Sequence, residues 1–165
     1  MTDKIVGSKI KIVSAKKEKV SLVLLFIKEL AEYEKLPNEV TATERLLKKT
    51  LFGKHSVAKV LIAYYENEPA GFAVYFFNFS TFVGKPGLYL EDVFVKPEFR
   101  GKGIGKAILI YLAGIAKKND CGRFEWAVLD WNKSAINFYK SIGAKPMDEW
   151  TVYRLDSEAI NVLVS

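Results

Sequence analysis

Residues 93–106 read VFVKPEFRGKGIGK, an apolar run followed by a turn with singly spaced glycines and the start of a second apolar-periodic segment. The run predicts a buried strand, and the glycines allow backbone N–H groups to crowd around one ligand. The expected helix behind the turn points the positive end of its dipole at the same place, next to Arg100, Lys102 and Lys106. This stretch therefore predicts a site for an anion such as a pyrophosphate.

The spacing of Gly101, Gly103 and Gly105 separates this turn from two common phosphate loops. The dinucleotide fingerprint needs G-x-G-x-x-G, whereas these glycines alternate singly. The Walker loop needs Ser or Thr after its lysine, whereas Ala107 follows Lys106. The alternative is a purely structural turn, in which the glycines only let the strand and the helix pack closely.

Hydrophobic periodicity on both sides of this stretch predicts a mixed, twisted sheet with flanking helices. A capping box at Thr41 and Glu44 is expected to start the second helix. The expected strands are 9–13, 57–65, 70–79, 88–95, 124–129 and 150–155. The expected helices are 16–34, 41–52, one from Ile104 past Ile115, and 134–142. The sequence therefore predicts one α+β domain over residues 1–165, with about six to seven strands.

Composition limits the classes of protein that remain. The chain has 165 residues, 50% of them hydrophobic, which suits one domain with its own core. A net charge of +6 suits an anionic ligand, such as a CoA phosphate, nucleic acid or an anionic surface. The most apolar run, 20–27, spans eight residues and is too short for a bilayer, which needs about 20 residues. We expect no membrane partner and no nucleic-acid partner.

The only cysteine, Cys121, excludes an intramolecular disulfide. The first four residues lack the basic and then apolar order of a secretory signal. We therefore expect a cytoplasmic protein. The only histidine, His55, has no second ligand near it in the sequence, so no metal site is expected.

Residues 100–105, RGKGIG, resemble the pyrophosphate loop of the GNAT superfamily of N-acetyltransferases, which reads Arg or Gln, any two residues, Gly, any residue, Gly or Ala. The expected order of elements also resembles this family. The resemblance implies acetyl-CoA as co-substrate, with the strand backbone on its pantetheine arm and the loop amides on its pyrophosphate. The cofactor-binding residues it implies are Val93, Phe94, Val95, Arg100, Gly101, Lys102, Gly103, Ile104, Gly105, Lys106, Asn132 and Tyr139.

Amine acetylation needs a proton acceptor, because a primary amine with a pKa of about 10.4 is mostly protonated at neutral pH. Glu91 resembles the acid that contacts the substrate amine, directly or through a water, in the diamine and polyamine branch of the family. Its neighbour Asp92 points to the opposite strand face and is expected either to bind substrate or to anchor loops. The alternative makes both residues ordinary rim carboxylates.

The departing sulfur needs a hydrogen-bond donor, and Tyr139 is the candidate. Residues 130–140 resemble the family segment in which an Asn, here Asn132, precedes this tyrosine by two helical turns. A phenol with a pKa of about 10 is a weaker acid than a thiol near 8.5, so we expect a hydrogen bond to the developing thiolate. The alternative leaves the Tyr139 hydroxyl in water.

Segments 29–35, 75–77, 88–92 and 127–132 resemble the spermidine/spermine and thialysine N-acetyltransferase group. The resemblance implies that Tyr33 and Glu34 contact the far end of a cationic substrate, that Trp150 lines the channel and that the enzyme is a homodimer. Ser80-Thr81-Phe82 replaces an aspartate of the polyamine enzymes. We therefore expect a short amine, such as a thialysine-like amino acid or a small diamine. The alternatives are a peptide or protein amine and a non-catalytic acyl-CoA-binding module.

Overall fold

The computed structural model describes residues 4–6 and 9–165. The chain forms two compact units, Met1–Ala127 and Val128–Ser165. The first unit contains the sheet and the helices that pack on it, and the second contains two shorter helices. Within the described residues, no helix is long and apolar enough to cross a membrane.

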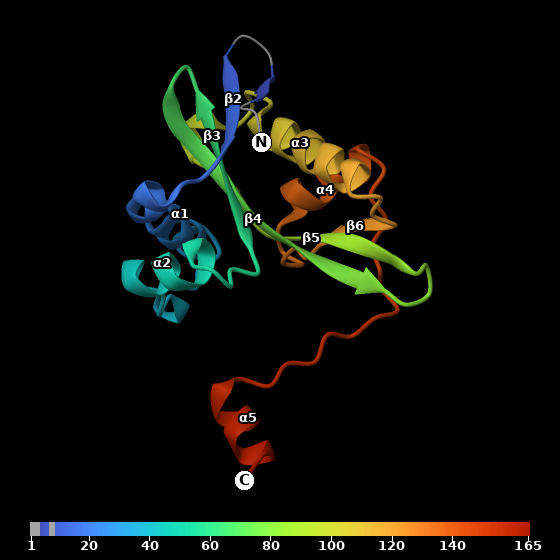
Figure 1. Ribbon diagram of the computed structural model, residues 1–165. Coiled ribbons are helices and arrows are strands. Elements are labelled where there is room, and N and C mark those ends of the chain that lie inside the picture. Colours follow the sequence, from blue (N-terminus) through green and yellow to red (C-terminus); the bar gives the residue numbers. More distant parts are fainter. Residues whose placement is uncertain (1–3, 7–8) are drawn as a thin grey trace. The chain divides into compact units, whose positions relative to one another are not determined.

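The described residues form one sheet of six strands, which follow one another in chain order across the sheet (Figure 1). Neighbouring strands are antiparallel except β5 and β6, which are parallel. This confirms the predicted mixed sheet of an α+β fold. The strands are β1 Lys4–Val6, β2 Ile10–Ser14, β3 Lys59–Tyr65, β4 Glu68–Ser80, β5 Lys85–Val95 and β6 Arg123–Trp126.

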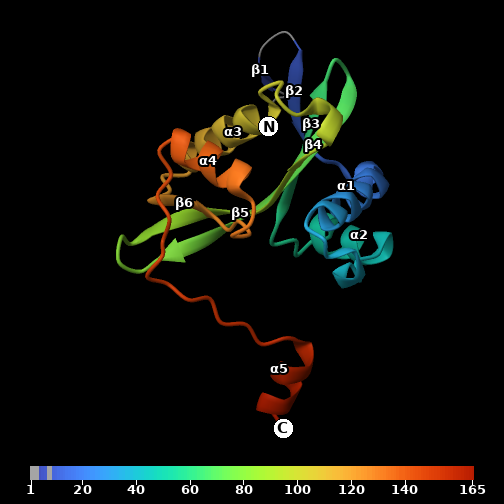
Figure 2. The same ribbon diagram turned by 180° about the vertical axis from the view of Figure 1, so that it is seen from behind.

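The helices of the first unit cover both faces of its sheet. Figures 1 and 2 show α1 and α2 on one face and α3 on the other. The α-helices are α1 Val20–Tyr33, α2 Glu44–Phe52, α3 Ile104–Lys118, α4 Lys133–Ser141 and α5 Ser157–Leu163. Single 3₁₀ turns are η1 Lys17–Lys19, η2 Pro37–Glu39 and η3 Pro97–Phe99.

The core beneath α1 fixes the position of this helix against β4 and β5. Phe26 of α1 stacks on Phe72 of β4, with ring centroids 5.3 Å apart, and meets the edge of Phe94 of β5 at 6.5 Å. All three side chains are buried. Burial of one such ring contributes about 1.5–3 kcal/mol to stability, so these aromatic contacts fix the position of α1 relative to β4 and β5.

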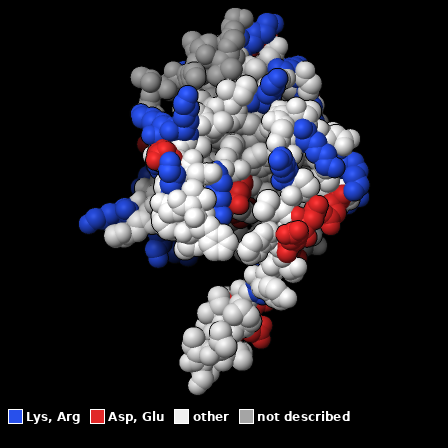
Figure 3. Space-filling model, turned by 90° about the vertical axis from the view of Figure 1, so that its right-hand side faces the viewer, with Lys and Arg blue, Asp and Glu red and all other residues white. Residues whose placement is uncertain are grey.

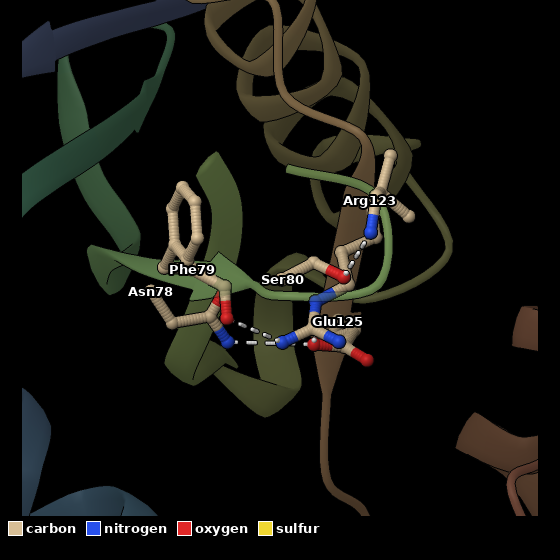
Figure 4. Close-up of polar contacts among 6 residues, drawn as sticks. Asn78, Phe79, Ser80, Arg123 and Glu125 are labelled. Atoms are coloured by element: carbon tan, nitrogen blue, oxygen red, sulfur yellow. Dashed lines mark hydrogen bonds and ion pairs between the residues drawn. The ribbon is translucent and has the colours of Figure 1, made fainter. Parts of the chain in front are cut away.

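Gly87 lets β4 and β6 interact across β5. Asn78 of β4 and Arg123 of β6 are its direct neighbours in the register. A Cβ atom on Gly87 would lie 2.2 Å from the Asn78 Oδ1. In the space left by the missing side chain, Asn78 Nδ2 donates to Glu125 at 3.4 Å, and Arg123 pairs with Glu125 at 2.9 Å (Figure 4). This polar cluster anchors β6 at the end of the sheet.

The structure contradicts the expected cap of the second helix and the expected strand at 150–155. The cap of α2 is Thr43, whose hydroxyl accepts from the Leu46 N–H at 3.2 Å, and not Thr41. Residues 150–155 do not form a strand. Their alternating pattern is that of a strand, but a strand needs a hydrogen-bonded neighbour. Side chains such as Trp150, Val152 and Tyr153 are exposed instead.

Candidate active site

The edge of β5 becomes open halfway along the strand. β6 pairs with β5 only from Gly87 to Leu90 and ends at Trp126. β5 continues to Val95 while paired with β4 alone. Among the described strands, none therefore covers the second edge of β5 beyond Leu90.

Val93 and Val95 direct their backbone groups to this open edge. The Lys96 N–H donates to the Ala70 carbonyl at 2.9 Å, which makes these two residues a hydrogen-bonded pair. Bonded and non-bonded pairs alternate along an antiparallel ladder. Phe94 and Asp92 thus bond to β4, whereas the backbone groups of Val93 and Val95 point away from it. These are the two residues whose backbone was expected to contact the pantetheine arm.

The turn after β5 ends in a helix terminus with free N–H groups. Gly101 and Gly103 have φ values of 76° and 81°, in the left-handed region that favours glycine. Gly103 is the N-cap residue of α3, so no side chain caps the first amides of this helix. Apart from the adjoining residues and the backbone of α3 itself, no heavy atom of the described chain lies within 4 Å of the positions that Cβ atoms on Gly101, Gly103 and Gly105 would occupy. The turn is therefore open to a ligand.

The side chains of Arg100 and Lys102 extend in different directions from this turn. The guanidinium of Arg100 lies 4.3 Å from the centroid of the Tyr33 ring, and its Nε donates to the Val95 carbonyl at 3.0 Å. The Lys102 ammonium lies 4.8 Å from the centroid of Tyr65 and 4.9 Å from that of Phe99. Arg100 thus contacts the end of α1, whereas Lys102 contacts the β3 side of the turn.

Carboxylates gather where α1 ends beside β5. Asp92 lies opposite Val74 in the register. The side chain of Val74 belongs to the core beneath α1, so Asp92 faces that side too. Burial, the charge of Glu91 and the charge of Glu34 raise the pKa of Asp92 to about 6. Burial also raises the pKa of Glu34. The fold thus brings Glu34, Glu91 and Asp92 together as a local negative cluster in a basic protein.

A β-bulge surrounds Glu91. Val74 pairs with Asp92 and the next residue, Tyr75, pairs with Leu90, so Glu91 has no partner on β4. Glu91 is exposed, and the bulge lies where β5 separates from β6. Bulges often redirect side chains next to active sites. This bulge explains how neighbouring acids can both contribute to one cluster.

The second unit carries the remaining predicted site residues. Asn132 caps α4, and its Oδ1 accepts from the Ala135 N–H at 3.2 Å. Tyr139 lies in α4, two helical turns after Asn132, which places both residues on one face. The Tyr139 ring packs against Phe138 at 5.6 Å. Trp150 is 69% exposed in the segment that was expected to form a strand.

The profile of the acetyltransferase (GNAT) family matches residues 25–144. The chain belongs to this family and is an N-acetyltransferase. It is 41% identical over 152 residues to the thialysine N-epsilon-acetyltransferase of Sus scrofa, covering 86% of this chain and 89% of the relative. It is 44% identical over 94 residues to an L-ornithine N5-acetyltransferase of Arabidopsis thaliana, covering 57% and 41%.

A solved structure supports the same fold. An integron cassette protein from the mobile metagenome of V. cholerae superposes with a TM-score of 0.80 and is 33% identical. The match covers 96% of this chain and 99% of that one. The single-sheet GNAT fold predicted from the glycine-rich turn and the order of elements is therefore confirmed.

The long-range contacts of the site were not predicted. Sequence reasoning named Tyr33, Glu34, Asp92 and Arg100 but did not pair them. The Arg100–Tyr33 contact joins the turn after β5 to the end of α1, and no local sequence pattern predicts it.

Proposed function

We propose that this enzyme transfers the acetyl group of acetyl-CoA directly to the primary amine of a small molecule. The observation that carries the proposal is the continuous backbone surface formed by the open edge at Val93 and Val95 and the uncapped start of α3. An extended amide-containing arm fits such an edge, and a pyrophosphate fits a helix N-terminus. The family itself is named for acetyl transfer.

The turn suits a pyrophosphate for two further reasons. The space beside Gly101 and Gly103 is open. The first turn of α3 contains Lys106 and no acid, so nothing there repels a phosphate. In this proposal residues 100–106 hold the pyrophosphate, mainly through their amides, and the backbone of residues 93–95 aligns the thioester with the bulge at Glu91.

The acid cluster is proposed to receive the amine. A protonated amine is attracted to the charges of Glu34, Glu91 and Asp92, and the transfer of its proton to Glu91, directly or through a water, leaves a nucleophilic nitrogen. That nitrogen attacks the acetyl carbonyl, the C–S bond breaks, and the nitrogen gives its second surplus proton to the departing thiolate, so that the products are the amide and the CoA thiol. Tyr139 then hydrogen-bonds to the departing sulfur while Asn132 helps orient CoA. The proposal for these two residues rests on the motif that they share with the family.

The substrate is proposed to be an amino acid with a second amine, with a small diamine or polyamine as the alternative. The names of two relatives, a thialysine and an ornithine acetyltransferase, support the amino acid. Nucleic acid is a weaker candidate. Figure 3 shows Lys and Arg in several separate groups on the face it presents, with Asp and Glu between them, and not in one basic stripe.

We also propose that the two units form one acetyltransferase domain that works as a homodimer. The family profile runs without a break from residue 25 to residue 144 and so includes parts of both units. Exposed apolar side chains in the C-terminal segment, among them Val152, Tyr153 and Leu163, favour a partner that covers them. In this proposal Trp150 lines a channel completed by the dimer.

Release of CoA with a panel of amines tests the function. The panel contains ornithine, lysine, thialysine, 1,4-diaminobutane, spermidine and an N-terminally free peptide, each with acetyl-CoA. We expect CoA release with the short amines and little with the peptide. CoA binding without turnover of any amine would contradict the proposal, and so would a clear preference for the peptide.

A further inference from the structure

We propose that the point where β6 joins β5 limits the transferred acyl group to the size of acetyl, and that Trp126 of β6 sets this limit. This inference rests on the proposed function, in which the thioester arm lies along the open edge of β5, and it adds the size of the acyl donor. The side chains that set the limit belong neither to the turn after β5 nor to the acid cluster.

The position of the turn gives the thioester arm a direction. The turn proposed to hold the pyrophosphate follows Val95, and among the described strands only β4 pairs with β5 beyond Leu90. An arm that begins at this turn therefore runs back along the open edge toward Leu90. Val95 and Leu90 lie five positions apart, which is about 16 Å along a strand. An extended pantetheine arm is of comparable length, so the acyl group at its end arrives next to Leu90.

The open edge of β5 closes at Leu90. β6 pairs with β5 from Gly87 to Leu90, and Trp126, the last residue of β6, is the partner of Leu90. Paired strands lie only about 4.8 Å apart, with their hydrogen bonds between them. An alkyl chain cannot pass through this ladder. An acyl group longer than acetyl, extended along the open edge, would therefore meet the end of β6.

Three large side chains form a row across the sheet at this point. Tyr75 of β4, Leu90 of β5 and Trp126 of β6 are direct neighbours in the register, so they share one face of the sheet. Tyr75 and Leu90 are each 1% exposed. Burial and the neighbouring Tyr111 of α3 raise the pKa of Tyr75 to about 12, so α3 covers this end of the row. The buried part of the row leaves no space for a longer acyl chain.

Trp126 is the member of this row that can be changed with the least damage to the core. Its ring packs against that of Phe124 in a T-shaped contact, with the centroids 4.9 Å apart. Phe124 is the partner of Leu88, so this contact holds the indole from the closed side of the strand pair. Trp126 is half-buried, unlike Tyr75 and Leu90, and a shorter side chain there leaves a smaller buried cavity.

Acyl-CoA donors of increasing length test the limit. The donors are acetyl-, propionyl-, butyryl- and hexanoyl-CoA, each with the amine of the panel above that the wild type acetylates fastest. The measured quantities are kcat/KM for each donor and, without any amine, the Kd of each donor by calorimetry. In the wild type we expect kcat/KM to fall about tenfold or more for each added methylene, because the extra carbons would meet the end of β6. The Kd should rise in the same order.

Trp126→Leu should raise the butyryl-to-acetyl ratio of kcat/KM by about tenfold or more, and Trp126→Phe should raise it less, since a phenyl ring frees less space. Phe124→Leu is the matched control. It removes a ring from the same face of β6, one row further from the open edge, so its ratio should stay near the wild-type value. Thermal unfolding shows whether each variant folds, and Trp126→Phe carries the comparison if Trp126→Leu does not fold.

The outcomes separate this inference from the function on which it rests. Similar kcat/KM for acetyl- and butyryl-CoA in the wild type would overturn the acyl limit and leave amine acetylation intact. An equal loss for both donors in Trp126→Leu would overturn the role of Trp126, and so would an equal rise of the ratio in Phe124→Leu. Binding restricted to short acyl groups, without transfer to any amine, would overturn the proposed function and support the acyl limit.

Discussion

Asp92 on β5 and Glu34 at the end of α1 lie close enough for the charge of one to affect the other, although 57 residues separate them in the sequence. After burial and Glu91, Glu34 is the third contributor to the raised pKa of Asp92, about 6. A carboxyl group with such a pKa changes its charge at a mildly acidic pH, at which the protein can be studied. Several measurable properties of the enzyme depend on this group and on the turn next to it.

Asp92 should make the free protein less stable as the pH rises from about 4 to about 6. The pKa of Asp92 in the folded protein, about 6, lies above the ordinary value of 3.8, so the folded state holds the proton more tightly than the unfolded state. At about 1.4 kcal/mol per pKa unit, the free energy of unfolding should fall by roughly 2 kcal/mol over this range and by roughly 3 kcal/mol between about pH 3 and pH 7. Urea unfolding of the wild type and Asp92→Asn at each pH measures this as the difference between them. Parallel pH profiles for the two proteins would refute the prediction.

Tyr139→Phe should lower kcat by about 10²-fold or more while the affinity for acetyl-CoA stays within about twofold, because only the donor to the leaving sulfur is removed. Stopped-time assays of CoA release and calorimetry with CoA measure the two quantities. Phe138→Leu is a control on the same helix, which alters the ring packed against Tyr139 but keeps the hydroxyl. An unchanged kcat in Tyr139→Phe would remove this residue from the mechanism.

Gly103→Ala and Gly105→Ala should have opposite effects on stability. Gly103 has a φ of 81°, which costs alanine about 1 kcal/mol, and the distorted turn should bind CoA more weakly. Gly105 lies inside α3 with open space beside it, so alanine should stabilise the protein by about 0.5–1 kcal/mol. Thermal unfolding with and without CoA measures both effects. Equal stability of the two variants would contradict this assignment of the turn.

Gly87→Ala should destabilise the protein by about 1–3 kcal/mol, because the new Cβ would displace Asn78 and break its hydrogen bond to Glu125. In the double variant Gly87→Ala/Asn78→Ala the clash with the Asn78 side chain is absent. The stability lost by the double variant should therefore be smaller than the sum of the losses in the two single variants. Urea unfolding of the four proteins gives this coupling directly. Strict additivity would mean that the Asn78 side chain does not depend on Gly87.

Local patterns made much of the fold predictable. The spacing of apolar residues and of the glycines after Val95 predicted β5, the turn and α3, because each depends on neighbours in the chain. The turn between β3 and β4 is another example. Glu66 and Asn67 both have positive φ values, 49° and 71°, as a two-residue hairpin turn requires. The family pattern at residues 100–105 then identified the fold.

Features that depend on distant residues could not be predicted in this way. Residues 150–155 have the alternation of a strand, but whether they form one depends on a neighbour that sequence periodicity does not supply. Thr41 and Thr43 are both candidate caps in the sequence, and in the structure Thr43 caps the helix, whose buried residue is Leu47. The proximity of Glu34 to Asp92 arises because α1 packs beside β5. The catalytic roles of Glu91 and Tyr139 stay predictions.

The bond between Arg100 and the Val95 carbonyl has a consequence for how binding energy is distributed. Without a ligand, this acceptor on the open strand edge is already satisfied by the protein itself. A pantetheine amide that arrives there would replace one hydrogen bond with another and gain little net free energy. The diphosphate should therefore contribute more to the affinity for a CoA thioester than this amide does, and a truncated thioester that ends before the diphosphate should be a poorer acetyl donor even though its reactive group is identical.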